Sequence, residues 1–155
     1  MTLTLTQTPE EIKEKWPNLT NDNARTTSEF DRFYNCLGFA VGDSDNWWWP
    51  IKKQGIFWPK DFPLINSTPN ILKMLNVMFA YEECNSGEFE EGYEKIAIYG
   101  IKESYTPKHY AIQTSDGKWK SKLGELEDIE HDTLEALNGF FYGVPIAFAK
   151  RKLSN

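Results

Sequence analysis

The dipeptide Asp116-Gly117 sets a strong limit on the fold, since it lies between two strand-like segments of the chain. Asp-Gly in such a place is the strongest short-range signal for a β-hairpin. The flanking segments are KHYAIQT at residues 108–114 and KWKSKLG at 118–124, and two further strand-like segments are EKIAIYGI at 94–101 and GVPIAFAKRK at 143–152. Together they predict a mainly antiparallel sheet of about four strands.

Four other segments carry helical patterns with capping residues. They begin at Thr8-Pro9, at Asn35 or Cys36, at Ser67-Thr68-Pro69 and at Asp128. The sequence therefore predicts an α+β protein in which helices, most of them N-terminal, cover one side of the sheet. We interpret residues 1–25 as a polar N-terminal extension and residues 26–152 as a single α+β domain.

The predicted hairpin allows two registers, which place Ser121 differently. A two-residue Asp116-Gly117 turn pairs Ser121 with Ile112, and the serine then lies on the face opposite His109. A three-residue loop with a bulge pairs Ser121 with Ala111, on the same face as His109. We favour the two-residue turn because it groups four apolar side chains on one face, those of Tyr110, Ile112, Trp119 and Leu123.

Length and charge exclude several classes of protein. The chain has 155 residues, which fits one domain, and a formal net charge of −6. That charge argues against a nucleic-acid partner and against docking on an anionic membrane. The N-terminus has no signal-peptide pattern, no stretch is apolar enough to span a membrane, and two cysteines do not make a disulfide framework. The expected location is cytoplasmic.

Cys36 and His109 are the residues best suited to catalysis. Cys36 stands at the start of a predicted helix, where the helix dipole and unpaired N–H groups lower the pKa of a thiol. A histidine on a facing strand, such as His109, can take the thiol proton. The backbone N–H of Cys36 would then help to bind an oxyanion. The alternative is that Cys36 is an inert buried cysteine and His109 a structural histidine.

No pattern in the chain predicts a cofactor or a metal. The sequence has no Gly-x-Gly-x-x-Gly, no P-loop, no His-Glu-x-x-His and no EF-hand loop. Zinc sites usually need at least one closely spaced pair of ligands, and none occurs among Cys36, Cys84, His109 and His131.

Two segments resemble the NlpC-type and CHAP-type branches of the papain-like cysteine peptidases and amidases. They are NCLGFA at residues 35–40 and HYAIQTSDGKWKSKLG at 109–124. The resemblance implies a papain-like, NlpC-like fold, with Cys36 as the nucleophile and His109 as the general base. A third residue orients the histidine in these enzymes. We assign it to His131, with Ser121 and Asp128 as alternatives.

A longer pattern resembles a family of uncharacterised bacterial domains. It runs over about residues 30–150 and consists of YNCLGFAVGD, WWWP, FWP, GYEKIAIY, HYA, WKSKLG and DIEH. This second resemblance implies no particular reaction.

Residues 43–66 form a long irregular segment with four tryptophans and three prolines. Indole rings can stack on a flat substrate, so we assign Trp47, Trp48 and Trp58 to substrate binding. Asn35 and Lys122 are further predicted substrate contacts. The alternative for the tryptophans is that they fix this long loop to the core.

These observations predict a thiol hydrolase that cleaves an amide bond in a peptide, isopeptide or muropeptide-type substrate through a Cys-His dyad. The competing hypothesis is a non-catalytic protein-binding or immunity-type module. The partner is in both cases a peptide-like molecule or a protein, and the oligomeric state is not predicted.

Overall fold

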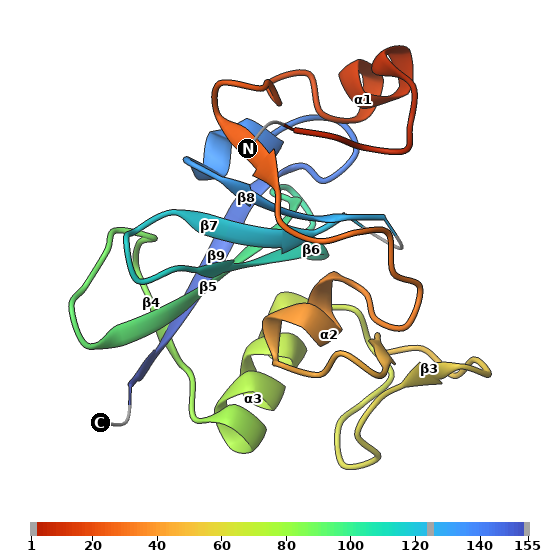
Figure 1. Cartoon of the computed structure of the whole chain (residues 1–155). Coiled ribbons are helices and arrows are strands. Elements are labelled where there is room, and N and C mark those ends of the chain that lie inside the picture. Colours follow the sequence, from red (N-terminus) through yellow and green to blue (C-terminus); the bar gives the residue numbers. More distant parts are fainter. Residues whose placement is uncertain (1–2, 124–125, 154–155) are drawn as a thin grey trace.

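A seven-stranded antiparallel sheet forms the centre of the computed structural model, which describes residues 3–123 and 126–153 (Figure 1). The strand order in the sheet is β1-β8-β7-β6-β5-β9-β4. In chain order these strands are β1 (Ala24–Thr26), β4 (Glu82–Cys84), β5 (Tyr93–Ile101), β6 (Thr106–Gln113), β7 (Trp119–Lys122), β8 (Asp128–His131) and β9 (Val144–Lys152). A separate pair, β2 (Trp47–Trp48) and β3 (Ile56–Phe57), is parallel.

The predicted papain-like domain, with helices packed on about four strands, is therefore wrong. The helices are α1 (Pro9–Lys15), α2 (Cys36–Ala40), α3 (Thr68–Phe79) and the 3-10 helix η1 (Leu134–Leu137). Figure 1 shows α2 and α3 on one side of the sheet, and α1 and η1 on the other. The three strands of this sheet that were not predicted have three or four residues each, which is too short for a periodic pattern to reveal them. Within the described ranges, none of the helices has the length and apolar character that crossing a membrane requires.

The three predicted helix starts in the first half of the chain are confirmed. The Thr8 hydroxyl accepts the Glu11 N–H at 3.2 Å, and Pro9 is the first helical residue of α1. Ser67 caps α3 in the same way, accepting the Asn70 N–H at 3.3 Å. These side chains satisfy N–H groups that have no partner within their own helix.

The predicted helix start at Asp128 is wrong, because residues 128–131 form strand β8. This strand pairs with β7 on one side and β1 on the other. Only Leu134–Leu137 is helical, as the short 3-10 helix η1. Alternation of Ile129 and His131 on one face suits a strand that is covered on that side.

The hairpin adopts the three-residue loop, so the register that we favoured is wrong. Ala111 pairs with Ser121, and the Thr114 N–H donates to the Lys118 carbonyl at 2.7 Å. A two-residue type I′ turn requires positive φ at both central residues. Among the described residues only Gly117 of this loop has positive φ, at 86°, so the chain closes through the longer loop.

Each face of the sheet buries its own apolar cluster. Strand alternation directs Ile96 and Ile98 of β5 to one face and Ala97 and Tyr99 to the other. We call the cluster beneath α2 and α3 the helix-side core; it contains Cys36, Leu37, Ile71, Met74, Leu75, Ile96, Ile98 and Tyr110. The opposite cluster, the N-terminal core, contains Trp16, Leu19, Ala24, Ala97, Tyr99, Ala111, Trp119, Ile129 and Tyr142. Residues within the segment 1–25, which we expected to be an extension outside the domain, thus contribute to the N-terminal core. Trp16, for example, is only 1% exposed.

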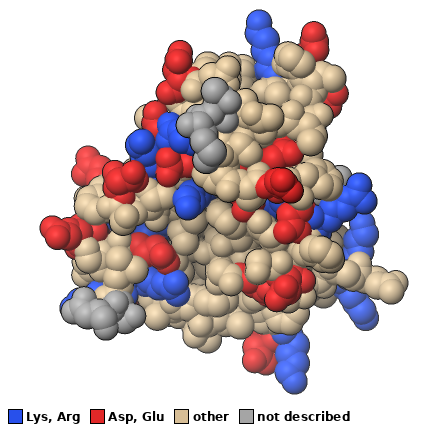
Figure 2. All heavy atoms as spheres, in the orientation of Figure 1, with Lys and Arg blue, Asp and Glu red and all other residues tan. Residues whose placement is uncertain are grey.

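Figure 2 shows acidic and basic side chains scattered over a face that is otherwise uncharged. Groups of both signs lie near one another in several places, without one large patch of either sign.

Candidate functional site

Cys36 is the first residue of α2 and lies in the helix-side core. Asn35 caps this helix, because its Oδ1 accepts the Gly38 N–H at 3.0 Å while its amide donates to the Trp48 carbonyl at 3.0 Å. The Cys36 side chain is buried, and burial raises the pKa of its thiol to about 12, although the Tyr110 N–H opposes this in part. A helix of five residues has little dipole to offset such burial. The thiol is therefore protonated at neutral pH.

His109 lies on β6 and points away from Cys36. The next residue, Tyr110, packs with Cys36 in the helix-side core, and consecutive residues of a strand point to opposite faces. The His109 ring instead stacks on Tyr142, with ring centroids 3.9 Å apart, and lies 5.3 Å from the Tyr99 ring. The structure thus places the two predicted members of the dyad on different faces of the sheet.

The imidazole of His109 is held as a neutral ring. It is fully buried, and neither ring nitrogen has a hydrogen-bond partner within residues 3–123 and 126–153. Burial, and after it the nearby His131, lowers the pKa of His109 well below 6.5. A base with this pKa and no bonded thiol is not placed to activate Cys36.

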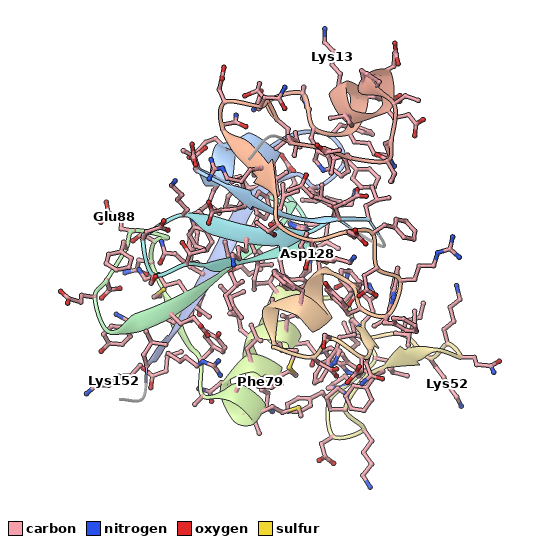
Figure 3. The ribbon with its side chains drawn as sticks, in the orientation of Figure 1. Lys13, Lys52, Phe79, Glu88, Asp128 and Lys152 are labelled. Carbon is pink, nitrogen blue, oxygen red and sulfur yellow. The ribbon has the colours of Figure 1, made fainter. Side chains whose placement is uncertain are left out.

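Asp128, one predicted alternative for the third catalytic residue, belongs to a buried polar cluster between the sheet and α2 (Figure 3). The Tyr34 hydroxyl donates to its Oδ2 at 2.6 Å, and burial followed by this bond raises the pKa of Tyr34 well above 10. Lys122 is fully buried and donates to the Leu126 carbonyl. Its amine is 3.9 Å from the Asp128 carboxylate and 4.6 Å from the centre of the Tyr34 ring. Lys122, a predicted substrate contact, is thus an internal anchor.

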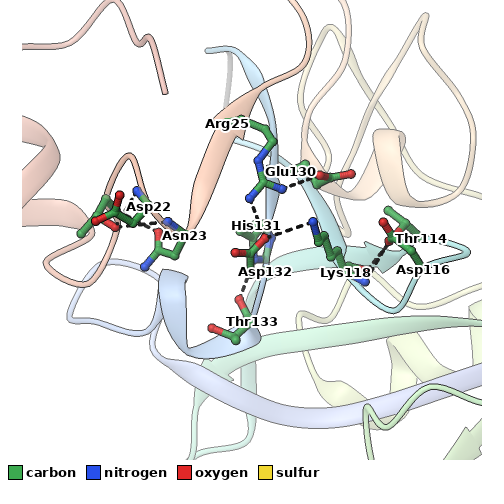
Figure 4. Close-up of polar contacts among 11 residues, drawn as sticks. Asp22, Asn23, Arg25, Thr114, Asp116, Lys118, Glu130, His131, Asp132 and Thr133 are labelled. Atoms are coloured by element: carbon green, nitrogen blue, oxygen red, sulfur yellow. Dashed lines mark hydrogen bonds and ion pairs between the residues drawn. The ribbon is translucent and has the colours of Figure 1, made fainter. Parts of the chain in front are cut away.

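Ser121 and His131 form a second buried pair, in the N-terminal core. The Ser121 Oγ and the His131 Nε2 are 2.8 Å apart. The His131 Nδ1 is 2.8 Å from the Thr133 carbonyl oxygen (Figure 4). A carbonyl only accepts, so Nδ1 carries the proton and the Ser121 hydroxyl donates to Nε2. Burial lowers the pKa of His131 to about 4. Both residues are fully buried, so they join β7 to β8 and do not face a substrate.

An ion network lies next to His131, as Figure 4 shows. Arg25 lies 2.5 Å from carboxylate oxygens of both Glu130 and Asp132, and Lys118 lies 3.7 Å from Asp132. These charges link β1, β7 and the end of β8. The network stabilises this edge of the sheet, and within the described residues none of its side chains is hydrogen-bonded to His109.

Trp47 and Trp48, both predicted substrate contacts, fix the long loop to the body of the domain. The Trp47 indole donates to the Arg32 carbonyl at 2.6 Å, and the buried Trp48 indole donates to Asp43 at 2.8 Å. Trp58 is different. Its indole donates to the Phe62 carbonyl at 3.2 Å, but the residue also lines a surface groove.

This groove, which we call the lysine groove, has a volume of about 760 Å³ and is formed by residues 51–64. Ile56, Trp58 and Phe62 are its more buried apolar residues. Three exposed lysines stand around it, Lys52, Lys53 and Lys60, and no acidic side chain lines it. Sequence reasoning singled out the tryptophans of this loop and missed the lysines, although three lysines among aromatic residues and prolines were visible in IKKQGIFWPKDFPL.

Two other kinds of functional site, a second surface hollow and a group of metal ligands, are not supported by the described residues. A hollow of about 830 Å³ beside β1 is lined by hydroxyl residues, Phe30 and the carboxylates of Glu29 and Glu127, and two of its threonines, Thr4 and Thr26, are hydrogen-bonded to each other. This lining provides no pair of nucleophile and base. In the part of the chain that the structure describes, no three side chains of histidine, cysteine, aspartate or glutamate are grouped to hold a metal ion.

Comparisons with known proteins give a family but no activity. No curated protein and no solved structure matches the chain significantly. The sequence does match the family described as "Domain of unknown function (DUF7689)" over residues 25–150, which is most of its length, so the chain belongs to that family.

Proposed function

We propose that this domain is a non-catalytic binding module that recognises an acidic protein segment with an apolar anchor residue through the lysine groove. The observation that carries the proposal is the composition of that groove. Three lysines surround apolar residues in a chain whose net charge is −6. A local positive site on a negative protein attracts an acidic ligand to that site in particular.

The surroundings of the groove support recognition of a protein surface. Several large apolar side chains next to it or within it are exposed, by 42% for Phe57, 43% for Ile51 and 53% for Leu64. Apolar residues framed by charges are typical of protein–protein contacts, where an aromatic or aliphatic anchor fills a pocket. The negative charge of the whole chain disfavours a nucleic-acid ligand.

The state of the predicted catalytic groups supports binding over hydrolysis. Cys36 is buried with a raised pKa, and His109 is packed between tyrosine rings on the other face. Each of Ser121, His131 and Asp128 is bonded to a partner other than His109. Among the residues that the structure describes, none of these groups presents a nucleophile to solvent beside its base.

The proposal is tested with a matched pair of charge variants. The groove variant is Lys52→Gln/Lys53→Gln/Lys60→Gln, and the control variant is Lys13→Gln/Lys102→Gln/Lys108→Gln, three exposed lysines outside the groove. Both variants lose three positive charges. A difference in their affinity for a ligand therefore depends on where the lysines lie and not on the net charge.

The probes are fluorescein-labelled peptides in which a phenylalanine, leucine or tryptophan is flanked by two glutamates on each side, with lysine-flanked peptides as a comparison. An exposed ion pair contributes about 0.2–1 kcal/mol, so three together give a loss of about 3- to 160-fold in affinity for the groove variant. Fluorescence anisotropy is expected to show this loss, and none in the control variant. Equal binding by all three proteins, or better binding of the lysine-flanked peptides, would refute the proposal.

A further inference from the structure

We propose that a second copy of this chain is an occupant of the lysine groove, which receives the acidic loop formed by residues 85–92 between β4 and β5. This inference rests on the proposed function and names a partner for the same groove. The acidic loop has the sequence NSGEFEEG, in which Phe89 stands between glutamates. It therefore has the composition that the groove is proposed to recognise.

The charges of the acidic loop are available for a partner. Glu88 and Glu91 are exposed, and neither makes an ion pair within the described residues. Phe89 is 48% exposed and lies against Gly117 of the hairpin loop. An exposed aromatic residue thus lies in the sequence between two exposed glutamates, Glu88 and Glu91.

The rest of the loop is held in place, which lowers the entropy that binding would cost. Glu90 is 2.8 Å from the amine of Lys95 and 3.0 Å from that of Lys150. The Lys95 amine also donates to the Ser86 carbonyl at 3.0 Å, and Gln113 donates to the Gly87 carbonyl at 2.9 Å. The loop therefore presents Phe89 from a fixed backbone.

The lysine groove complements this loop in charge and in its apolar surface. Lys52, Lys53 and Lys60 are exposed and make no ion pair among the residues that the structure describes. Asp61 is the one acidic residue within residues 51–64, and it does not line the groove. Trp58 and its apolar neighbours offer a surface for an aromatic anchor.

The two surfaces lie at opposite sides of the molecule. Figure 3 shows Glu88 at one side of the ribbon and Lys52 at the other. A copy therefore cannot fill its own groove, and the contact between copies is head-to-tail. Contacts of this kind produce closed rings when the rotation closes, and open chains when it does not.

The test uses the full chain and two complementary variants. Sedimentation velocity of the wild-type protein is expected to show concentration-dependent association that weakens at least about tenfold between 50 and 500 mM salt, since exposed charges are screened. The groove variant and a loop variant, Glu88→Gln/Phe89→Ser/Glu91→Gln, are each expected to be monomeric. The control variant is expected to associate like the wild type.

Mixing the two deficient variants gives the decisive result. The groove variant keeps an intact loop and the loop variant keeps an intact groove, so the mixture is expected to form a 1:1 dimer that cannot grow. A monomeric wild-type protein at about 1 mM, or association that the groove variant retains, would overturn the inference. If the wild type stays monomeric but binds the acidic peptides through the groove, only self-recognition fails. If the peptides also fail to bind, the proposed function fails with it.

Discussion

His131 makes the stability of this domain depend on pH in a way that can be calculated. Its ring is fully buried, it accepts a hydrogen bond from Ser121, and it donates to the Thr133 carbonyl, an arrangement that requires the neutral tautomer. Burial lowers its pKa in the folded state to about 4, although the charges of Asp132 and Glu130 oppose the shift. In the unfolded chain the pKa of a histidine is about 6.5.

Because the folded pKa lies below the unfolded pKa, the unfolded state binds the proton first as the pH falls. The stabilisation is present above about pH 6.5 and is lost as the pH falls towards 4. Linkage from 6.5 to about 4 gives a loss of about 2 kcal/mol in the free energy of unfolding between pH 7.5 and pH 5. His109, whose pKa is also lowered by burial, adds a loss of the same sign.

The assay is urea denaturation followed by tryptophan fluorescence at pH 7.5, 6 and 5. His131→Gln keeps a donor and an acceptor but cannot titrate, so it is expected to remove about 2 kcal/mol from the difference between pH 7.5 and pH 5. The control is Asp116→Asn. The Thr114 hydroxyl and then the Lys118 N–H hold the pKa of Asp116 below 3.8, outside this range. A wild-type free energy of unfolding that does not change with pH here, or one whose change His131→Gln leaves intact, would refute the burial argument.

Three further predictions follow from side chains near α2. In a Cys84→Ser protein at pH 7.5, Cys36 is expected to resist iodoacetamide until urea unfolds the chain, as measured by mass spectrometry; rapid alkylation below pH 7 would contradict its burial. Tyr34→Phe removes the 2.6 Å bond to the buried Asp128 carboxylate and is expected to lower the free energy of unfolding by about 1–3 kcal/mol in urea. Gly38→Ala brings a Cβ to 2.4 Å from a backbone carbonyl oxygen and is expected to lower the melting temperature by several degrees, whereas an unchanged value would contradict the close packing of this turn.

Local signals in the sequence predict those elements whose cause is local. The cap of α3 depends on Ser67 and on Pro69 within the first turn, and both are visible in the sequence. The long strands β5 and β9 have enough apolar residues for their sequence pattern to predict them. The short strands β1 and β4 form because they pair with β8 and β9 at the two edges of the sheet, and nothing within three residues encodes such a neighbour.

The error in the hairpin register shows a limit of a different kind. Asp116-Gly117 favours a two-residue turn, and apolar grouping on one face favours the same register. The protein instead buries polar Ser121 in the N-terminal core, where His131 of the next strand satisfies its hydroxyl. Two polar side chains can be stable inside a core when all of their hydrogen bonds are satisfied. A sequence pattern that counts only apolar residues cannot detect such a pair.

The sequence predicts the local structure around Cys36 but not the burial of its thiol. Asn35 caps a helix at Cys36 as expected, but helix position alone does not decide the reactivity of a thiol. Burial decides it here, and burial depends on how α2 packs on β6. The lysine groove depends on how residues 51–64 fold back on themselves, so the sequence shows its charges but not their convergence.

The pKa values of Cys36 and His109 bear directly on the choice between hydrolysis and binding. An active dyad needs a thiolate beside an imidazolium, which is favoured only when the pKa of the thiol falls close to that of the imidazole. In this protein burial shifts the two groups apart, to about 12 for Cys36 and well below 6.5 for His109. Both shifts oppose the transfer of a proton from the thiol to the imidazole. Binding through the lysine groove needs no such proton transfer, because it depends only on exposed side chains that meet the ligand at the surface.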